Sequence, residues 1–480
     1  MKMSEYKHQH PVMIILETFK SIIYAIPPVF FFALSIRDEL SSVDIPLLAA
    51  IALITTLTYS TAKWYFFTYQ YENGYLHIRK GLLFKKERSI KRERVQTVNV
   101  ITNFIQKLLG VTSLHVKTAG STEAELSLTA VTLQESQNIK TYLENHATNE
   151  SGKNHAEESE TGNEQVDTVN TYNVPLRNLL LAGATSGRFM LLFSLIAAAL
   201  SQLYPYIPES YMGLILEQVI PRNNINISLL LILIFGLLLL SWIISTLVFA
   251  VQFANFTLQR QENDIRISYG LIEQKEYNLN MKRIQALSVK DSLLRQPLNL
   301  CSIYAEVAGG SSEKQDYVTT LYPLLNLREL SRFMDNMFPE YIIPENMHPL
   351  PLRSRKRYII RLLVPAIVIV LLLQLVPYGW VSLLVLPPTF LLGLSRYNTG
   401  GTAILEKQLT LRFRNIHRYH VFVLRDHIQT MQISSNPFQR MSDLDTIGIS
   451  VLSSRGGNRF ALADVDREES GKIWNWFSRN

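Results

Sequence analysis

The sequence predicts a multi-pass α-helical membrane protein that carries three cytosolic α+β domains, and three observations lead to this fold class. Residues 67–120 recur without a gap at residues 256–309, and a third, weaker copy begins near Tyr397. Each copy directly follows a pair of strongly apolar segments. Only 18% of the residues are charged, whereas an ordinary soluble domain carries roughly 25%. A chain of 480 residues has room for about three domains.

Each pair of apolar segments is expected to form a hairpin of two transmembrane helices, because windows of about 20 residues are almost free of charge. The six expected spans are Val12–Ile36, Ile45–Phe67, Phe189–Leu203, Leu229–Val251, Tyr358–Val376 and Val381–Leu394. Basic residues gather on the side of the repeats, and the turns between paired spans hold one Arg or none. The positive-inside rule therefore places the N-terminus and all three domains in the cytosol.

Alternating apolar and polar residues predict strands in the first repeat domain. The expected strands are Tyr75–Lys80, Lys85–Lys91, Val95–Val100, Leu114–Thr118 and Ala124–Leu128. Residues Thr132 to Glu135 form a capping-box pattern that opens a terminal helix. The second domain ends in a helix opened by Asn326 to Glu329, and the third ends in a helix carrying Ile473. Strands followed by one terminal helix indicate a small α+β domain.

Residues 147–172 are polar and acidic, and a segment so poor in apolar side chains cannot repay its ordering entropy. We therefore interpret it as a disordered linker. The predicted divisions are hairpin 12–67, domain 68–146, linker 147–172, hairpin 187–255, domain 256–340, hairpin 358–396 and domain 397–480.

The residues Gly81-Leu-Leu, Arg94-Val-Gln, Gln106-Lys-Leu-Leu-Gly and Lys117-Thr-Ala-Gly resemble the bacterial PH-like domain of YdbS/YdbT-type membrane proteins. The resemblance covers nearly the whole chain, because the paired spans belong to the same architecture. It implies a bacterial cytoplasmic-membrane protein in which each domain is a partly open barrel or sandwich of about seven strands with a C-terminal helix. It implies no catalytic residue and no cofactor, and it suggests a role in cell-envelope stress or resistance to antimicrobial peptides.

Positions shared by the copies are interpreted as structural residues of the repeat. They are Gly81, Gln96, Gly120, Gly270, Gln285, Gly309 and Gln429. The third copy departs from the pattern, since Arg414 stands where the first has Gly81.

The strongest charge feature is the stretch Arg79–Arg94 in the first domain. Its basic residues are the candidate lipid- or partner-binding site: Arg79, Lys80, Lys85, Lys86, Arg88, Lys91, Arg92 and Arg94. Beside an anionic membrane each would contribute roughly 1 kcal/mol. The alternative is a solvated strand face that follows the positive-inside bias. Because the aligned stretch of the second copy has only Lys275, Lys282 and Arg283, the first domain is the favoured lipid site.

An apolar loop with one basic residue follows the same strand in each copy, at residues 104–109, 293–298 and 438–441. We expect the loop to be tucked over the core of its domain. A loop that touches the membrane or binds a partner is the alternative.

No Ser/His/Asp set, Walker loop or paired-carboxylate site is present, so we expect no enzyme, cofactor or metal site. His417 and His420 would face opposite sides of a strand. The leading hypothesis is a non-enzymatic scaffold whose domains bind anionic lipid or a protein partner, such as a smaller one-unit YdbS-like membrane protein. The alternative is a transporter or export component, which would place charges or broken helices at the bilayer midplane. The central parts of the spans are almost free of ionisable residues, which favours the first hypothesis.

Overall fold

The computed structural model describes residues 6–35, 44–82, 84–118, 126–144, 170–203, 227–261, 264–308, 318–376, 378–452 and 458–478. The chain forms two compact units. The first comprises residues 1–168, 266–268 and 272–279, and the second comprises residues 169–265, 269–271 and 280–480.

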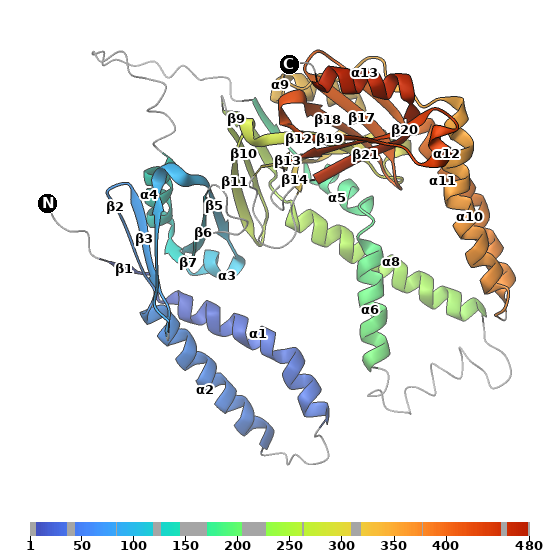
Figure 1. Cartoon of the computed structure of the whole chain (residues 1–480). Helices are drawn as coiled ribbons and strands as arrows, with labels where there is room; N and C mark the ends of the chain where they lie inside the picture. Colours follow the sequence, from blue (N-terminus) through green and yellow to red (C-terminus); the bar gives the residue numbers. More distant parts are fainter. Residues whose placement is uncertain are drawn as a thin grey trace, which may run out of the picture. The chain divides into compact units, whose positions relative to one another are not determined.

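The first unit begins with a helical hairpin, formed by α1 (Val12–Ser35) and α2 (Asp44–Tyr65), that adjoins two small sheets (Figure 1). One sheet has the antiparallel order β1-β2-β3-β4, with strands Lys7–His8, Thr68–Glu72, Tyr75–Lys80 and Lys86–Lys91. The next elements are η1 (Arg92–Arg94), β5 (Val95–Thr102), α3 (Phe104–Leu108), β6 (Val111–Thr118), β7 (Leu126–Thr132) and α4 (Leu133–Glu144). These strands form a sheet in the order β7-β6-β5, and β11 (Gln274–Asn280) of the second repeat pairs antiparallel with β5.

Apolar side chains at every second strand position close the core of this unit. Leu76 and Ile78 of β3 and Leu114 of β6 are buried, because alternate residues of a strand point to the same face. Helix α4 covers them with Ile139 and Leu143, which lie one turn apart on one helix face. The Thr132 hydroxyl accepts the backbone N–H of Glu135 at 3.4 Å, so the expected capping residue does begin the helix.

The second unit contains the apolar helices and most of the strands of the second and third repeats. Its second-repeat elements are β8 (Asn170–Asn173), α5 (Leu176–Ala184), α6 (Phe189–Leu203), α8 (Ile227–Gln252), β9 (Thr257–Gln261), β10 (Asp264–Tyr269), η3 (Met281–Arg283), β12 (Ile284–Asp291), η4 (Gln296–Leu298), β13 (Leu300–Val307), β14 (Val318–Asn326), η5 (Leu327–Glu329) and α9 (Leu330–Met337). Its third-repeat elements are β15 (His348–Pro349), η6 (Leu352–Ser354), α10 (Arg355–Leu373), η7 (Gly379–Val385), α11 (Leu386–Thr399), β16 (Gly401–Ile404), β17 (Gln408–Arg414), β18 (Arg418–Leu424), η8 (Arg425–His427), β19 (Ile428–Ser434), α12 (Pro437–Arg440), β20 (Leu444–Val451), β21 (Asn458–Asp466) and α13 (Arg467–Ser478).

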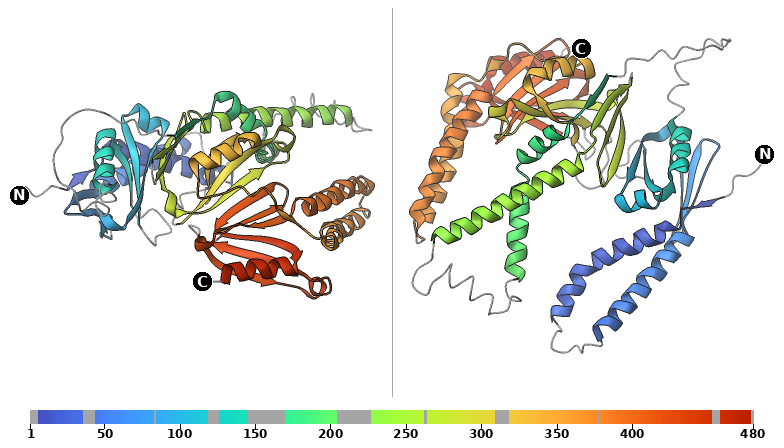
Figure 2. Two further views of the ribbon diagram at one scale, coloured as in Figure 1. Left: turned by 90° about the horizontal axis from the view of Figure 1, so that it is seen from above. Right: turned by 180° about the vertical axis from the view of Figure 1, so that it is seen from behind.

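A seven-stranded sheet in this unit joins the two repeats in the order β14-β13-β12-β18-β17-β16-β15. Strands β12 and β18 pair antiparallel from Ala286↔Val423 to Asp291↔Arg418. A second sheet, β19-β20-β21, and helix α13 enclose the apolar core of the third repeat (Figure 2). Each repeat thus supplies seven strands, β1–β7, β8–β14 and β15–β21, which agrees with the expected number. The expected partly open barrel or sandwich is extended in one respect, because strands of neighbouring repeats pair within shared sheets.

The expected membrane spans are met only in part. Within the described residues, Leu231–Gln252 and Gly379–Thr399 are long and apolar enough to cross a bilayer. A third crossing is added if Leu176–Ala184 and Phe189–Gln202, bent by 61°, are counted as one span. By this criterion the described residues contain two or three candidate spans, and the other predicted spans are not confirmed.

Two boundaries also change. Of the expected linker 147–172, residues 147–169 lie outside the described part, and Asn170–Tyr172 belong to β8. The expected strand Ala124–Leu128 is β7, which the structure describes from Leu126 to Thr132.

Candidate functional site

The eight basic residues predicted as a binding site lie along β3, β4 and the turn η1 of the first unit, except Lys85, which directly precedes β4. Part of their charge is satisfied locally: Arg79 pairs with Glu87 at 2.8 Å, and Lys91 pairs with Glu93. The Arg92 guanidinium lies over the Tyr142 ring, 5.2 Å from its centroid. The two ion pairs lie among exposed side chains, as in the alternative of a solvated strand face, whereas Arg92 and Tyr142 are half-buried.

Lys80 and Lys86 differ from the others because they face each other across the β3–β4 hairpin. Like charges directly opposite in a sheet repel each other, and neither lysine forms an ion pair within the described chain. Burial, followed by Arg88, Lys86 and Lys63, lowers the pKa of Lys80. An anion between these two lysines would relieve the repulsion.

Both lysines line a cavity of about 530 Å³ between the hairpin β3–β4 and the ends of α1 and α2. Its acidic lining residue, Glu17, is already paired with Lys63 at 2.7 Å. Apolar lining comes from Tyr59, Phe67 and Phe84. The cavity therefore combines unpaired positive charge with apolar surface where the helices meet the domain.

The repeat-motif residues have unequal roles. Gly81 has a φ of 124°, and a Cβ there would come within 2.0 Å of the Phe84 carbonyl oxygen, so only glycine fits. Gly270 adopts a similar φ of 112°. Arg414, at the aligned position of the third copy, lies inside β17 and needs no positive φ.

The structure describes fewer contacts for the remaining motif residues. Gln285 donates to the Arg283 carbonyl at 3.4 Å, and Gln429 is exposed on β19. Gln96 lies in β5, although its side chain is outside the description, as are Gly120 and Gly309 entirely.

The loop after strands β5, β12 and β19 is built the opposite way from the one expected. Most of its apolar side chains are exposed, including Phe104, Leu108, Leu294, Phe438 and Met441, although Ile105 packs against a buried cluster. One polar side chain at the same position of each copy is buried instead: Gln106, Arg295 and Gln439. The tucked-loop expectation is therefore wrong, and the exposed apolar residues agree with the alternative of a membrane- or partner-contacting loop.

The buried amides satisfy their own loops. Gln106 accepts the Asn103 N–H at 2.9 Å and donates to the Ser113 hydroxyl at 2.7 Å and the Thr129 carbonyl at 2.8 Å. Gln439 makes the same arrangement with Asn436 and Thr446, and it also donates to Asp464 at 2.8 Å.

In the second repeat the position of this buried glutamine is occupied by Arg295. Arg295 donates to the Thr185 hydroxyl at 2.9 Å, the Ala182 carbonyl at 3.0 Å, the Pro323 carbonyl at 3.3 Å and the Ser302 hydroxyl. All four acceptors are uncharged. A buried cation is costly without a compensating charge. Burial lowers the pKa of Arg295, and the nearby Asp291, which acts to raise it, is itself paired with Arg418 at 2.6 Å, so an excess of positive charge remains here.

Three more basic groups surround Arg295 in a cavity of about 270 Å³. Arg188, Lys290 and His417 line it together with hydroxyl groups, and no acidic side chain does. Burial, followed by Arg295 and Arg188, lowers the pKa of Lys290. Burial, followed by Lys290 and Arg295, lowers the pKa of His417, whose buried Nδ1 has no hydrogen-bond partner in the described structure. We call these four residues with their cavity the basic cavity.

The basic cavity lies where membrane helices meet the shared sheet. Ser186 and Arg188 come from the bend between α5 and α6, and Phe249 and Phe253 come from the end of α8. Lys290 is in β12, and His417 directly precedes β18. Cations, hydroxyl donors and a little apolar surface are the groups that bind a phosphate.

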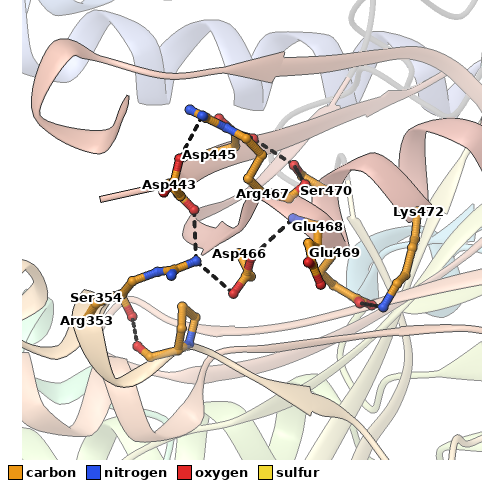
Figure 3. A network of polar contacts seen from close by, with 11 residues as sticks. Arg353, Ser354, Asp443, Asp445, Asp466, Arg467, Glu468, Glu469, Ser470 and Lys472 are labelled. Atoms are coloured by element: carbon orange, nitrogen blue, oxygen red, sulfur yellow. Dashed lines mark hydrogen bonds and ion pairs between the residues drawn. The ribbon is translucent and has the colours of Figure 1, made fainter. Parts of the chain in front are cut away.

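The third repeat offers a contrast, because its charges neutralise each other (Figure 3). Arg353 donates to the Asp466 carboxylate at 2.8 Å and to the Asp443 carbonyl at 3.2 Å. Arg467 pairs with Asp443 at 2.8 Å. The start of α13 is thereby fixed to the segment before α10, and little charge is left for a ligand.

The prediction that favoured the first domain rested on counting basic residues. It missed the cluster of Arg188, Lys290, Arg295 and His417, in which Arg188 and His417 lie more than 100 residues from the other two. One signal was available: Arg295 stands where the other two copies have glutamine.

Comparison of the sequence with known protein families also finds three copies of one domain. A family model described as bacterial PH domain matches residues 21–147, 212–339 and 359–480. The chain is also 30% identical, over 492 residues, to the UPF0699 transmembrane protein YdbT of Bacillus subtilis (strain 168), with 99% of each sequence covered.

Proposed function

Because this chain belongs to the bacterial PH domain family and its relative YdbT is a transmembrane protein, we propose that it is a membrane-anchored interaction protein without enzymatic activity. In this proposal it crosses the bacterial cytoplasmic membrane with three hairpins, its domains face the cytosol, and it serves the cell envelope under stress. Its second domain holds an anionic headgroup in the basic cavity.

The observation that carries this proposal is the buried guanidinium of Arg295 beside Lys290 and Arg188, with no acidic residue in the cavity lining. Positive charges confined in a cleft raise the local concentration of anions. The position at the ends of α5 and α8 fits a group that sits at headgroup depth. The lysine pair Lys80 and Lys86, which has two cations instead of four basic residues, offers a second and more open place for binding an anion.

Thermal unfolding of the full chain in nanodiscs tests the proposal, because a ligand that binds only the folded state raises its stability. The comparison is between neutral lipid, neutral lipid with added inorganic phosphate, and lipid containing an anionic phospholipid. We expect the anionic lipid to raise the melting temperature of the wild type and to do so much less for Arg295→Gln. A rise with free phosphate alone would assign the cavity to a soluble anion.

Glutamine is the residue that the other two repeats carry at this position, so the variant keeps a side chain that the fold accepts. Lys407→Gln is the matched control, since it removes one positive charge from an exposed turn. Equal shifts in the wild type and in Arg295→Gln would refute the proposed headgroup site.

A further inference from the structure

The chain twice joins one repeat to the next by the same strand pair. Strands β4, β11 and β18 precede the 3-10 turn of their repeats, and we call them the leading strands. Strands β5, β12 and β19 follow that turn, and we call them the following strands. Leading strand β11 pairs with following strand β5, and leading strand β18 pairs with following strand β12.

The two junctions have the same register. At the first, Thr102 pairs with Gln274 and Val100 pairs with Glu276. In the following strand, the repeat offset of 189 residues aligns Thr102 with Asp291 and Val100 with Val289. In the leading strand, the offset of 144 residues aligns Gln274 with Arg418 and Glu276 with His420. At the second junction Asp291 does pair with Arg418, and Val289 does pair with His420. The junction is therefore a repeated interface rather than a chance contact.

One leading and one following strand remain at sheet edges. Strand β4 ends the sheet β1-β2-β3-β4, and β19 ends the sheet β19-β20-β21, so each has a single neighbour in the described strand orders. Five of the six β4 residues are exposed, whereas the engaged leading strands have one exposed residue in β11 and none in β18. An open edge presents unpaired backbone groups to another chain.

We propose that β4 of one copy pairs antiparallel with β19 of a second copy, in the register of the two internal junctions. That register places Arg88 opposite Gln432, Lys86 opposite Ser434 and Ile90 opposite Thr430. The same chain carries both halves of the interface, so the contact is head-to-tail and builds a ring or an open row of copies.

Basic residues on β4 do not oppose this pairing. Charged side chains can protect an edge from association, yet the engaged leading strands also carry them. Lys275 of β11 lies opposite Ile101, and Arg418 of β18 forms an ion pair of 2.6 Å with Asp291 across the junction.

Disulfide trapping in intact membranes tests the pairing and its register. Two differently tagged full-length chains are co-expressed, one with Arg88→Cys and the other with Gln432→Cys. The native Cys301 stays, because it is fully buried. Directly opposite strand residues have Cβ atoms about 4.5–5.5 Å apart, and diagonal neighbours about 7–8 Å, so only the opposite pair approaches disulfide geometry.

We expect a disulfide-linked heterodimer of the two tagged chains, and several-fold less product when Gln432→Cys is replaced by Thr430→Cys. Lys86→Cys with Ser434→Cys is a second exposed pair in the same register, in case one variant folds poorly. The proposal is overturned if neither pair links, if the diagonal pair links equally well, or if Arg88→Cys links only to itself. It is also overturned if Arg88→Cys captures a smaller protein instead of a second copy.

Discussion

At the residue scale, the side chain at positions 106, 295 and 439 differs between the repeats in its charge and in the groups that it contacts. In the first and third repeats a glutamine closes its own loop through both ends of its amide. In the second repeat the arginine takes over the same place, contacts the same Ser/Thr position at Ser302, and extends to Ala182 and Thr185 at the end of α5. A structural residue of the loop has thereby become a charged residue of a cavity.

Replacing Gln106 by alanine should destabilise the first unit. The change leaves the Asn103 N–H without its side-chain acceptor and leaves the Ser113 hydroxyl and the Thr129 carbonyl with only their mutual hydrogen bond of 3.1 Å, which costs about 2–3 kcal/mol. Thermal unfolding of the purified full chain in detergent measures the change. Gln429→Ala is the control, since that exposed side chain should contribute within about 0.5 kcal/mol. Equal effects of the two substitutions would show that the buried amide is not structural.

At the element scale, the helices of a hairpin approach each other through glycine. A Cβ on Gly393 of α11 would lie 2.9 Å from the Ile359 Cα of α10, so the two backbones touch where no side chain fits. Small residues permit such close packing between membrane helices. Gly183 of α5 has a similar position, with the Thr246 carbonyl of α8 at 2.9 Å.

Gly393→Leu should separate α10 from α11 and lower the melting temperature of the full chain in detergent. Overpacking of this kind costs about 1–3 kcal/mol. Gly236→Leu in α8 is the matched control, because no atom lies within 4 Å of a Cβ at that position. If Gly393→Leu melts at the same temperature as Gly236→Leu, the helices do not pack through this glycine.

The β12–β18 junction should weaken in acid. Burial, followed by Arg418 and Arg412, lowers the pKa of His420 from 6.5 to about 3. The unfolded chain therefore binds the proton more readily than the folded chain, so His420 contributes stability above about pH 6.5 that is lost as the pH falls toward 3. Other groups titrate in this range, and the comparison of wild type with His420→Gln isolates the one histidine.

Thermal unfolding between pH 7 and pH 4 provides the measurement. The wild type should lose more stability over this interval than His420→Gln. Parallel pH profiles would contradict a neutral, half-buried His420 at the junction.

At the scale of the whole molecule, the sequence predicted the repeated unit but not how the units connect. Period-two alternation in Tyr75–Lys80 and the Thr132 cap are local signals, and both appear in the structure. The pairing of β12 with β18 is not local, because the sequence of neither strand specifies which strand it pairs with. The basic cavity was missed for the same reason: Arg188, Lys290 and His417 meet only once that sheet has formed.

For the apolar helices the sequence predicted more than the described structure confirms. Composition alone predicted six spans, but the described helices include two or three that pass a length and hydropathy test. Segments such as Phe189–Leu203 are short, and α5 and α6 bend by 61° between them. A count of apolar residues cannot distinguish a complete crossing from a bent or partial one.

The central claim is that the basic cavity holds one anionic headgroup, and native mass spectrometry of the full chain released from nanodiscs with anionic lipid tests it most directly. The account predicts that the wild type and Lys407→Gln each retain a bound anionic lipid, and that Arg295→Gln loses it. Equal retention by Arg295→Gln, or no retained lipid on the wild type, would contradict the account.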